Sequence, residues 1–168
     1  VFSESGSFKI PHTMEKMKDG LFYITFTRVK RMPLISIIKA LGLTKDEDIM
    51  RFTFFDQQSD DVFVNLLEFV DIKTEEEAQD WIAKRIGITQ SKEIRIERMQ
   101  EIVDKYLLPH LGTKKEDRIF KAYNLCKYLK KFILVTRGQM PLDDKDHYIN
   151  KRIKMSGDLL ADLFRVNL

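Results

Sequence analysis

Helical periodicity of the apolar residues runs through most of this chain and points to a largely helical fold. Apolar residues recur every three or four positions in five stretches: residues 34–41, 75–86, 91–107, 114–135 and about 147–166. This spacing places apolar side chains on one face of each helix, and that face needs a partner to bury it. In residues 114–135 it predicts that Leu129 and Ile133 are buried and that Lys121 faces water. With 43% hydrophobic residues, the 168-residue chain can form one substantial core.

Turn and capping residues divide these stretches into separate helices. Pro33 suits the first turn of a helix, and Gly42 follows the first helical stretch, where a left-handed residue commonly ends a helix. Three pairs have the spacing of a capping box, in which the hydroxyl accepts from a backbone N–H three residues on and the carboxylate reaches back. These pairs are Thr44 with Glu47, Thr74 with Glu77, and Thr113 with Glu116. They predict helix starts near residues 45, 75 and 114.

A short β element is expected before the helices. Residues 21–29 are rich in β-branched and aromatic side chains and contain no glycine or proline, which is typical of a strand. Asp19-Gly20 favours a turn, and residues 8–10 are the expected antiparallel partner of this strand. Because so small a sheet needs helices to cover it, we predict an α+β fold. It would be mostly helical, with a small antiparallel β element near the N-terminus and a C-terminal helix.

Membrane and secreted classes are not indicated. The longest apolar runs, such as residues 132–135, are far too short to cross a membrane. No basic-then-apolar leader opens the sequence, so we expect no secretion. The single cysteine, Cys126, lies in a helical apolar pattern and is expected to be a core residue in a reducing, cytoplasmic compartment. The sequence begins with Val1 and ends at Leu168 inside an apolar pattern, and we expect it to be a segment of a longer protein.

Motifs for catalysis or metal binding are sparse. One cysteine and three distant histidines, His12, His110 and His147, lack the spacing of a zinc site, and the glycines lack that of a phosphate-binding loop. Asp60-Asp61 is expected to solvate the first turn of a helix and not to share a metal ion. Spacing alone leaves open a nucleophile pair of Cys126 with a histidine, so a small stand-alone enzyme is one alternative.

Charge is distributed in blocks along the chain. The net charge is +4 over residues 1–42, −7 over 43–90, +6 over 91–142 and zero over 143–168. A basic stretch can bind phosphate, although it is more often a solvated helix face. The acidic block at 43–90 suggests another alternative, an independent protein-interaction module that binds basic partners.

Residues 143–158 combine dense charge with interleaved apolar side chains. If a helix starts by residue 146, Asp146, Asn150 and Lys154 share one of its faces, with Lys151 and Arg152 beside it. Carboxylate and amide groups can recognise the edge of a base, and cations can hold phosphate. The alternative is that this segment binds no ligand and forms a charged, N-capped amphipathic helix.

The same segment resembles a known protein family. The residues that carry the resemblance are Asp143-Asp144-Lys145-Asp146-His147-Tyr148, Asn150-Lys151-Arg152, Gly157 and Leu163-Phe164-Arg165. They resemble a signature of the second-largest subunit of multisubunit DNA-directed RNA polymerases. Residues 32–43 and 106–112 resemble the lobe region of that subunit, in the same order, and the residues are more like archaeal sequences than bacterial or eukaryotic ones. Ile149 stands where the family commonly has Gly, and Lys39 stands where Arg is more usual. A β-branched side chain strains a positive φ, so we expect none at Ile149.

This resemblance implies a supporting role in transcription. The lobe is expected to form one wall of the downstream DNA cleft, to contact other polymerase subunits and to receive general transcription or cleavage factors. Residues 1–142 would form the lobe domain, and residues 143–168 would be a signature segment leading into the next polymerase domain. No catalytic residue and no cofactor is expected in this chain, because the Mg²⁺ site of the parent nucleotidyltransferase belongs to other parts of the enzyme.

The resemblance also implies which residues contact DNA: Asp146, Asn150, Lys151 and Arg152. In bacterial relatives this segment helps to form a pocket for a nontemplate-strand base. Asp146 is expected to accept from a base amino group, and the two cations are expected to hold the neighbouring backbone. So few cations give a Kd of roughly 10⁻⁴ M or weaker at physiological salt, so the isolated chain should bind DNA poorly. The chain alone is expected to have no polymerase activity.

Overall fold

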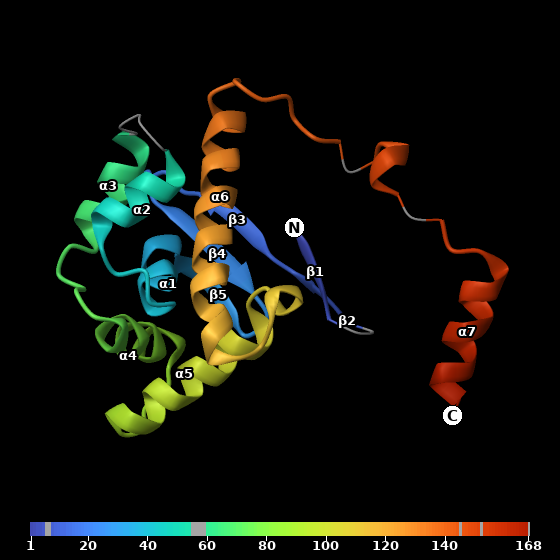
Figure 1. Ribbon diagram of the computed structural model, residues 1–168, viewed down its shortest axis with the longest axis horizontal. Helices are drawn as coiled ribbons and strands as arrows, with labels where there is room; N and C mark the ends of the chain where they lie inside the picture. Colours follow the sequence, from blue (N-terminus) through green and yellow to red (C-terminus); the bar gives the residue numbers. More distant parts are fainter. Residues whose placement is uncertain (6–7, 55–59, 145, 152, 168) are drawn as a thin grey trace. The chain divides into compact units, whose positions relative to one another are not determined.

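Five short strands occupy the first 33 residues, and helices make up most of the chain after them (Figure 1). The structure, a computed structural model, describes residues 1–5, 8–54, 60–144, 146–151 and 153–167. Its architecture is α+β, with a C-terminal helix, which confirms the predicted fold class. The chain divides into two compact units, residues 1–133 and residues 134–168. The buried apolar residues of the described chain all belong to the first unit.

The strands form two antiparallel sheets. The two-stranded sheet pairs β1 (Phe2–Ser5) with β2 (Phe8–Pro11). The three-stranded sheet has the order β3 (Thr13–Lys16), β4 (Phe22–Phe26), β5 (Val29–Pro33). Alternate residues of β4 are fully buried, which is the pattern of a strand with one face in the core.

The β element differs from its prediction in two ways. Residues 21–29 are not one strand, because Arg28 has a left-handed φ of 70° and the chain reverses between β4 and β5. Strand propensity is high on both sides of this turn, so composition did not reveal it. Residues 8–10 pair with β1, and the partner of β4 is β3. The predicted turn at Asp19-Gly20 is confirmed by a φ of 81° at Gly20 and by a hydrogen bond from Leu21 N–H to Asp19 Oδ1 (2.9 Å).

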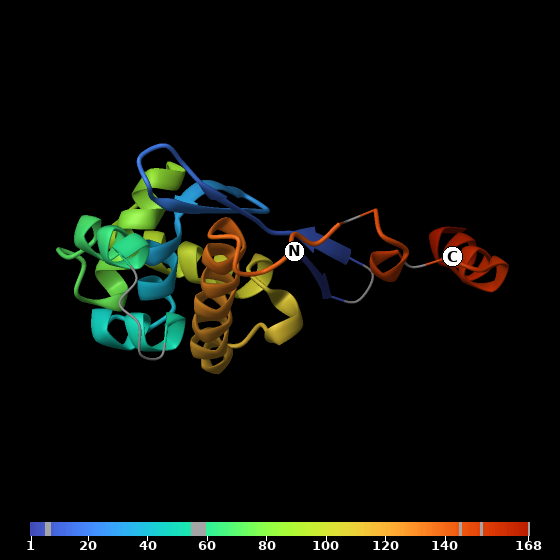
Figure 2. The same ribbon diagram turned by 90° about the horizontal axis from the view of Figure 1, so that it is seen from above.

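The helices pack on the buried face of the three-stranded sheet. In the first unit they are α1 (Leu34–Ala40), α2 (Asp46–Thr53), α3 (Asp60–Glu68), α4 (Glu75–Ile86), α5 (Lys92–Tyr106) and α6 (Arg118–Thr136), with 3₁₀ turns η1 (Pro109–Leu111) and η2 (Lys115–Asp117). Every residue of α1 is buried, so this short helix is the centre of the core. Figure 2 shows α1 and α6 on the same side of the sheet, and Phe132 of α6 meets Phe22 of β4 edge to face, with ring centroids 5.7 Å apart.

One of the three predicted capping boxes is confirmed. Thr74 Oγ1 accepts from Glu77 N–H (3.2 Å), Glu77 accepts from Thr74 N–H (3.1 Å), and α4 spans the predicted residues 75–86. The other two pairs form no capping box, although α2 does begin near the predicted residue 45. At α2 the residue before the helix is Lys45, which makes no side-chain cap, and the carboxylate that reaches back before α6 belongs to Asp117, which accepts from Lys114 N–H. Consequently α6 begins at Arg118 and not near residue 114.

Two lysines are buried in the first unit. Lys39 Nζ donates to the carbonyl oxygens of Phe69 (2.8 Å) and Ile72 (3.0 Å). Lys121 was expected to face water, but its Nζ is buried and donates to the carbonyl oxygens of Val103 (3.2 Å) and Asp104 (2.9 Å) at the end of α5. Burial lowers the pKa of Lys121 to about 8. In both cases a cation donates to carbonyl groups at or just beyond the end of a helix, and two of these groups also accept from a backbone N–H: Phe69 from Ile72 (3.2 Å) and Val103 from Leu107 (3.2 Å).

The second unit contains one 3₁₀ turn and one helix in its described residues. These are η3 (Tyr148–Asn150) and α7 (Ser156–Asn167). The single helix predicted over about residues 147–166 was therefore wrong in its first part, since α7 begins only at Ser156. Among the described helices of both units, none combines the length and the apolar character that a membrane span requires.

Candidate nucleic-acid interface

The signature segment forms a turn that is held by its own polar groups. Asp144 begins it, because its carboxylate accepts from Asp146 N–H (2.9 Å) and its carbonyl oxygen accepts from His147 N–H (3.1 Å). His147 then uses its Nδ1 to accept from Ile149 N–H (3.2 Å), which starts η3. These local bonds are typical of short polar side chains that compete with helix formation, and they explain why the helix does not start here.

Asn150 closes the turn. Its Nδ2 donates to the Asp143 carboxylate and to the Asp144 carbonyl oxygen, each at 2.7 Å. Both amide hydrogens are therefore used inside the turn, and only the amide oxygen remains to meet a ligand. A contact of Asn150 with DNA through its amide N–H groups would require breaking these bonds.

Asp146 and Lys151 are accessible to solvent. Their side chains are 70% and 52% exposed, and the Lys151 Nζ lies 3.9 Å from Asp146 Oδ1 and 5.9 Å from the centre of the Tyr148 ring. Both contacts are loose, so each group is available to a ligand. Arg152, the fourth predicted residue, lies outside the described residues.

The predicted helical face is not present. Asp146, Asn150 and Lys154 do not share a helix, because the described part of residues 146–154 contains only the 3₁₀ turn η3. Lys154 instead pairs with Asp162 of α7 at 2.7 Å. The turn nevertheless brings Asp146, Asn150 and Lys151 together within one short stretch of chain. Ile149 has no positive φ, which agrees with the expectation that its β-branched side chain excludes one.

The second unit also carries exposed apolar side chains. The exposed residues of the turn and its exit are Tyr148, Ile149, Ile153 and Met155 (73–86% exposed), and those of α7 are Leu159, Leu160, Leu163, Phe164 and Val166. A row of leucines and a phenylalanine at helical spacing is the pattern of a helix that packs against something. The second unit therefore carries an apolar surface suited to contact with other protein.

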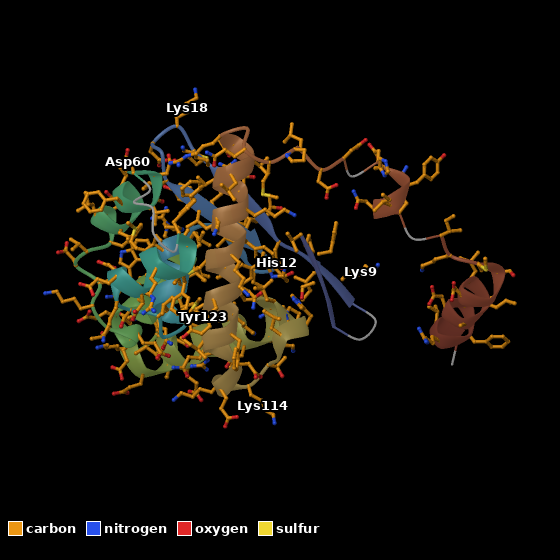
Figure 3. The ribbon with its side chains drawn as sticks, turned by 45° about the horizontal axis from the view of Figure 1, so that its top comes forward. Lys9, His12, Lys18, Asp60, Lys114 and Tyr123 are labelled. Atoms are coloured by element: carbon orange, nitrogen blue, oxygen red, sulfur yellow. The ribbon has the colours of Figure 1, made fainter. Side chains whose placement is uncertain are left out.

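The side chains considered for catalysis have structural roles. Burial raises the pKa of the Cys126 thiol to about 12, so the thiolate that a nucleophile needs is not formed at neutral pH. His12 accepts from Leu108 N–H through Nε2 (3.1 Å), while its Nδ1 lies 3.1 Å from the Ile10 carbonyl oxygen. Figure 3 shows His12 within the first unit, beside the strands. Burial lowers its pKa, so it stays neutral and joins the strands to the residues after α5.

Asp143, Asp144 and His147 are the functional candidates that reasoning about DNA contact missed. They belong to the signature, yet they hold the turn and do not extend from it. Their spacing to Asn150 and to the following backbone N–H groups is the feature that could have predicted this role, since Asp, Asn and His commonly bond to nearby backbone.

Comparison with known proteins assigns a family to this arrangement. The sequence matches the family described as RNA polymerase Rpb2, domain 2, over residues 3–154. It is 41% identical over 168 residues to DNA-directed RNA polymerase subunit Rpo2 of Saccharolobus solfataricus, which covers 99% of this chain. It is 36% identical over 173 residues to subunit Rpo2N of Halobacterium salinarum and 37% identical over 169 residues to Rpo2N of Methanocaldococcus jannaschii, with 100% and 98% of this chain covered. The chain spans only 15%, 33% and 34% of the lengths of these three relatives.

Proposed function

Because the chain belongs to the RNA polymerase Rpb2 domain 2 family, we propose that it is the lobe of a DNA-directed RNA polymerase, where it forms one wall of the downstream DNA cleft. Membership in the family confirms the resemblance drawn from the signature at residues 143–165 and from the two upstream segments. The proposed partners are other polymerase subunits, downstream DNA and transcription or cleavage factors, in the cytoplasm. Nucleotide transfer and its Mg²⁺ would belong to other parts of the parent enzyme.

The exposed pair of Asp146 and Lys151 is the observation that carries the DNA contact. A carboxylate and an ammonium group stand together on a turn whose backbone is fixed by Asp143, Asp144 and Asn150. In the proposed role, Asp146 accepts from the amino group of an unpaired base, and Lys151 holds the adjacent phosphate. We assign Asn150 to holding the turn, because its amide hydrogens are already used. Arg152 is proposed as a second phosphate contact.

The apolar surface of α7 supports a place within a larger assembly. Its leucines and Phe164 are exposed in the described chain, and a helix in water seldom leaves such a row uncovered. We propose that other parts of the same polymerase subunit cover it. This packing would hold the DNA-contacting turn in place, so that its few charges act at high effective concentration on DNA already in the cleft.

The test uses the assembled polymerase with Lys151→Ala and Arg152→Ala combined. We expect shorter-lived complexes on downstream DNA. The slope of log lifetime against log salt concentration should become shallower by about one unit for each phosphate that the variant no longer neutralises. Lys127→Ala with Lys131→Ala is the matched control, since it removes two exposed cations from α6. An unchanged lifetime across the salt series, or an equal effect of the control, would overturn the proposed contact.

A further inference from the structure

Helix α3 presents a second apolar surface, which the described residues of the first unit leave uncovered. Phe63, Val64 and Leu67 of α3 and Val70 just beyond it are each about half exposed, between 49% and 54%. We call these four residues the α3 face. Residues 63 and 67 are four positions apart and form a ridge on α3, and Val70 continues this spacing in the turn that follows the helix. An isolated exposed leucine would need no explanation, but an apolar ridge of this kind is typical of a binding surface.

The α3 face is held rigidly from behind. The opposite side of α3 buries Val62, Asn65 and Leu66 in the core. The Asn65 side chain accepts from Phe22 N–H (2.8 Å) and donates to the carbonyl oxygens of Gly20 (3.1 Å) and Asp61 (2.7 Å). A surface fixed in this way loses little conformational freedom when a partner binds, which favours affinity.

The rim of the α3 face is acidic. Residues 60–72 contain four acidic residues and no lysine or arginine. Lys16 pairs with Asp61 at 2.8 Å, whereas no described cation forms an ion pair with Asp60, Glu68 or Asp71. Figure 3 shows Asp60 at the outer edge of the first unit, where α3 starts. Lys84 and Lys92 line the same pocket as Asp71, so the rim is acidic on balance and not of one charge. A mainly acidic rim around an apolar centre favours a partner of the opposite charge and disfavours nucleic acid.

We propose that the α3 face binds an amphipathic helix with a cationic border, supplied by a partner protein. The apolar row of the partner would pack along the ridge of residues 63, 67 and 70, as one helix packs into the groove beside another. Its lysines or arginines would lie beside Asp60, Glu68 and Asp71. This inference depends on the proposed function in one respect only, which is the source of the partner helix. That source would be a factor or another subunit that contacts the polymerase lobe.

The test measures binding of two synthetic helical peptides to the full chain. Both carry the same row of leucines, but one is bordered by lysine and the other by glutamate. We expect the lysine peptide to bind and the glutamate peptide to bind at least about tenfold more weakly, as complementary charge on a shared apolar surface requires. Phe63→Ser and Leu67→Ser should each weaken the lysine peptide by about tenfold or more.

Matched variants separate the apolar and charged contributions. Phe120→Ser removes a phenylalanine of α6 that is 58% exposed and should leave peptide binding unchanged. Glu68→Gln with Asp71→Asn should weaken the lysine peptide a few-fold at low salt and have little effect at high salt, because exposed charges are screened. All variants should keep the wild-type circular dichroism and thermal midpoint, since each substituted side chain is exposed.

Three outcomes would overturn the proposal. These are equal binding of the two peptides, no effect of Phe63→Ser and Leu67→Ser, and concentration-dependent self-association of the chain that Leu67→Ser abolishes. The last outcome would make a second copy of this chain the occupant. Because these measurements use the chain without the polymerase, they do not depend on the Lys151 experiment, so failure of one proposal is distinguishable from failure of the other.

Discussion

Lys39 Nζ donates to the carbonyl oxygen of Phe69 at 2.8 Å, although 30 residues separate them in the chain. The same ammonium group donates to the Ile72 carbonyl oxygen (3.0 Å) and lies 2.9 Å from the Asp46 carboxylate. One buried cation therefore joins the end of the central helix α1 to the chain that leaves α3. This buried cation therefore helps to hold α3, and with it the exposed α3 face, in position.

Substitution of Lys39 should destabilise the first unit. Lys39→Met removes the donor from two carbonyl groups and leaves Asp46 without its partner, so the free energy of unfolding should fall by about 3 kcal/mol. Lys39→Arg keeps a positive donor, as in the family residue that is usual at this position, and should lose less than half as much. Urea unfolding followed by circular dichroism measures both. A loss below about 1 kcal/mol for Lys39→Met would contradict the structural role.

Capping shows why local patterns predicted some boundaries and missed others. Thr44 with Glu47 and Thr74 with Glu77 have the same spacing, yet only the second pair forms a box. A capping threonine must be the last non-helical residue, and at α2 that residue is Lys45. Where the helix starts there depends on how α2 meets the core, because Ile49 and Thr53 are its buried residues. A four-residue motif carries no information about such tertiary constraints.

Periodicity predicted the apolar core well and the buried cations poorly. It placed Leu129 and Ile133 on the buried side of α6, and the structure agrees. It also placed Lys121 toward water, because a pattern of apolar and polar residues treats every lysine as a surface residue. The carbonyl groups at the end of α5 come from a distant part of the sequence, and they accept the hydrogen bonds that make burial of Lys121 possible.

The burial of Lys121 should make stability depend on pH. Its pKa is lowered to about 8 in the folded chain from an ordinary 10.5, so between these values the unfolded chain binds a proton that the folded chain lacks. The free energy of unfolding should therefore rise with pH above 8, with a slope of at most about 1.4 kcal/mol per pH unit from this group. Below pH 8 both states are protonated, and this contribution becomes flat.

Lys121→Met isolates this contribution. Cys126, whose pKa is raised to about 12 from 9, opposes it above pH 9, because there the unfolded chain loses a proton that the folded chain keeps. Denaturant unfolding at pH 7, 8 and 9 should show the difference between wild type and Lys121→Met changing between pH 8 and 9, because Cys126 contributes equally to both proteins. A constant difference over this range would show that Lys121 keeps an ordinary pKa.

The arrangement of the candidate site differs from the one that spacing predicted. A helix over about residues 147–166 was expected from spacing. Instead Asp158 accepts from Met155 N–H (3.1 Å) and starts α7 after that residue. Before it, Asp144 and His147 direct their hydrogen bonds to nearby backbone. Helical spacing of charges cannot distinguish these local bonds from a helix, because both use the same polar residues.

Substitution of Asn150 tests whether this residue stabilises the turn or contacts DNA directly. Asn150→Ala removes two hydrogen bonds of 2.7 Å to Asp143 and Asp144, so backbone order parameters over residues 146–151 should fall toward those of a mobile loop. The unfolding midpoint should stay within experimental error, because the buried apolar core lies in residues 1–133.

Lys151→Ala is the matched control and should leave the turn ordered, since its contacts are loose. Nitrogen-15 relaxation of the labelled chain measures both variants. If Asn150→Ala leaves the order parameters unchanged, Asn150 does not hold the turn and becomes a candidate for direct contact with DNA.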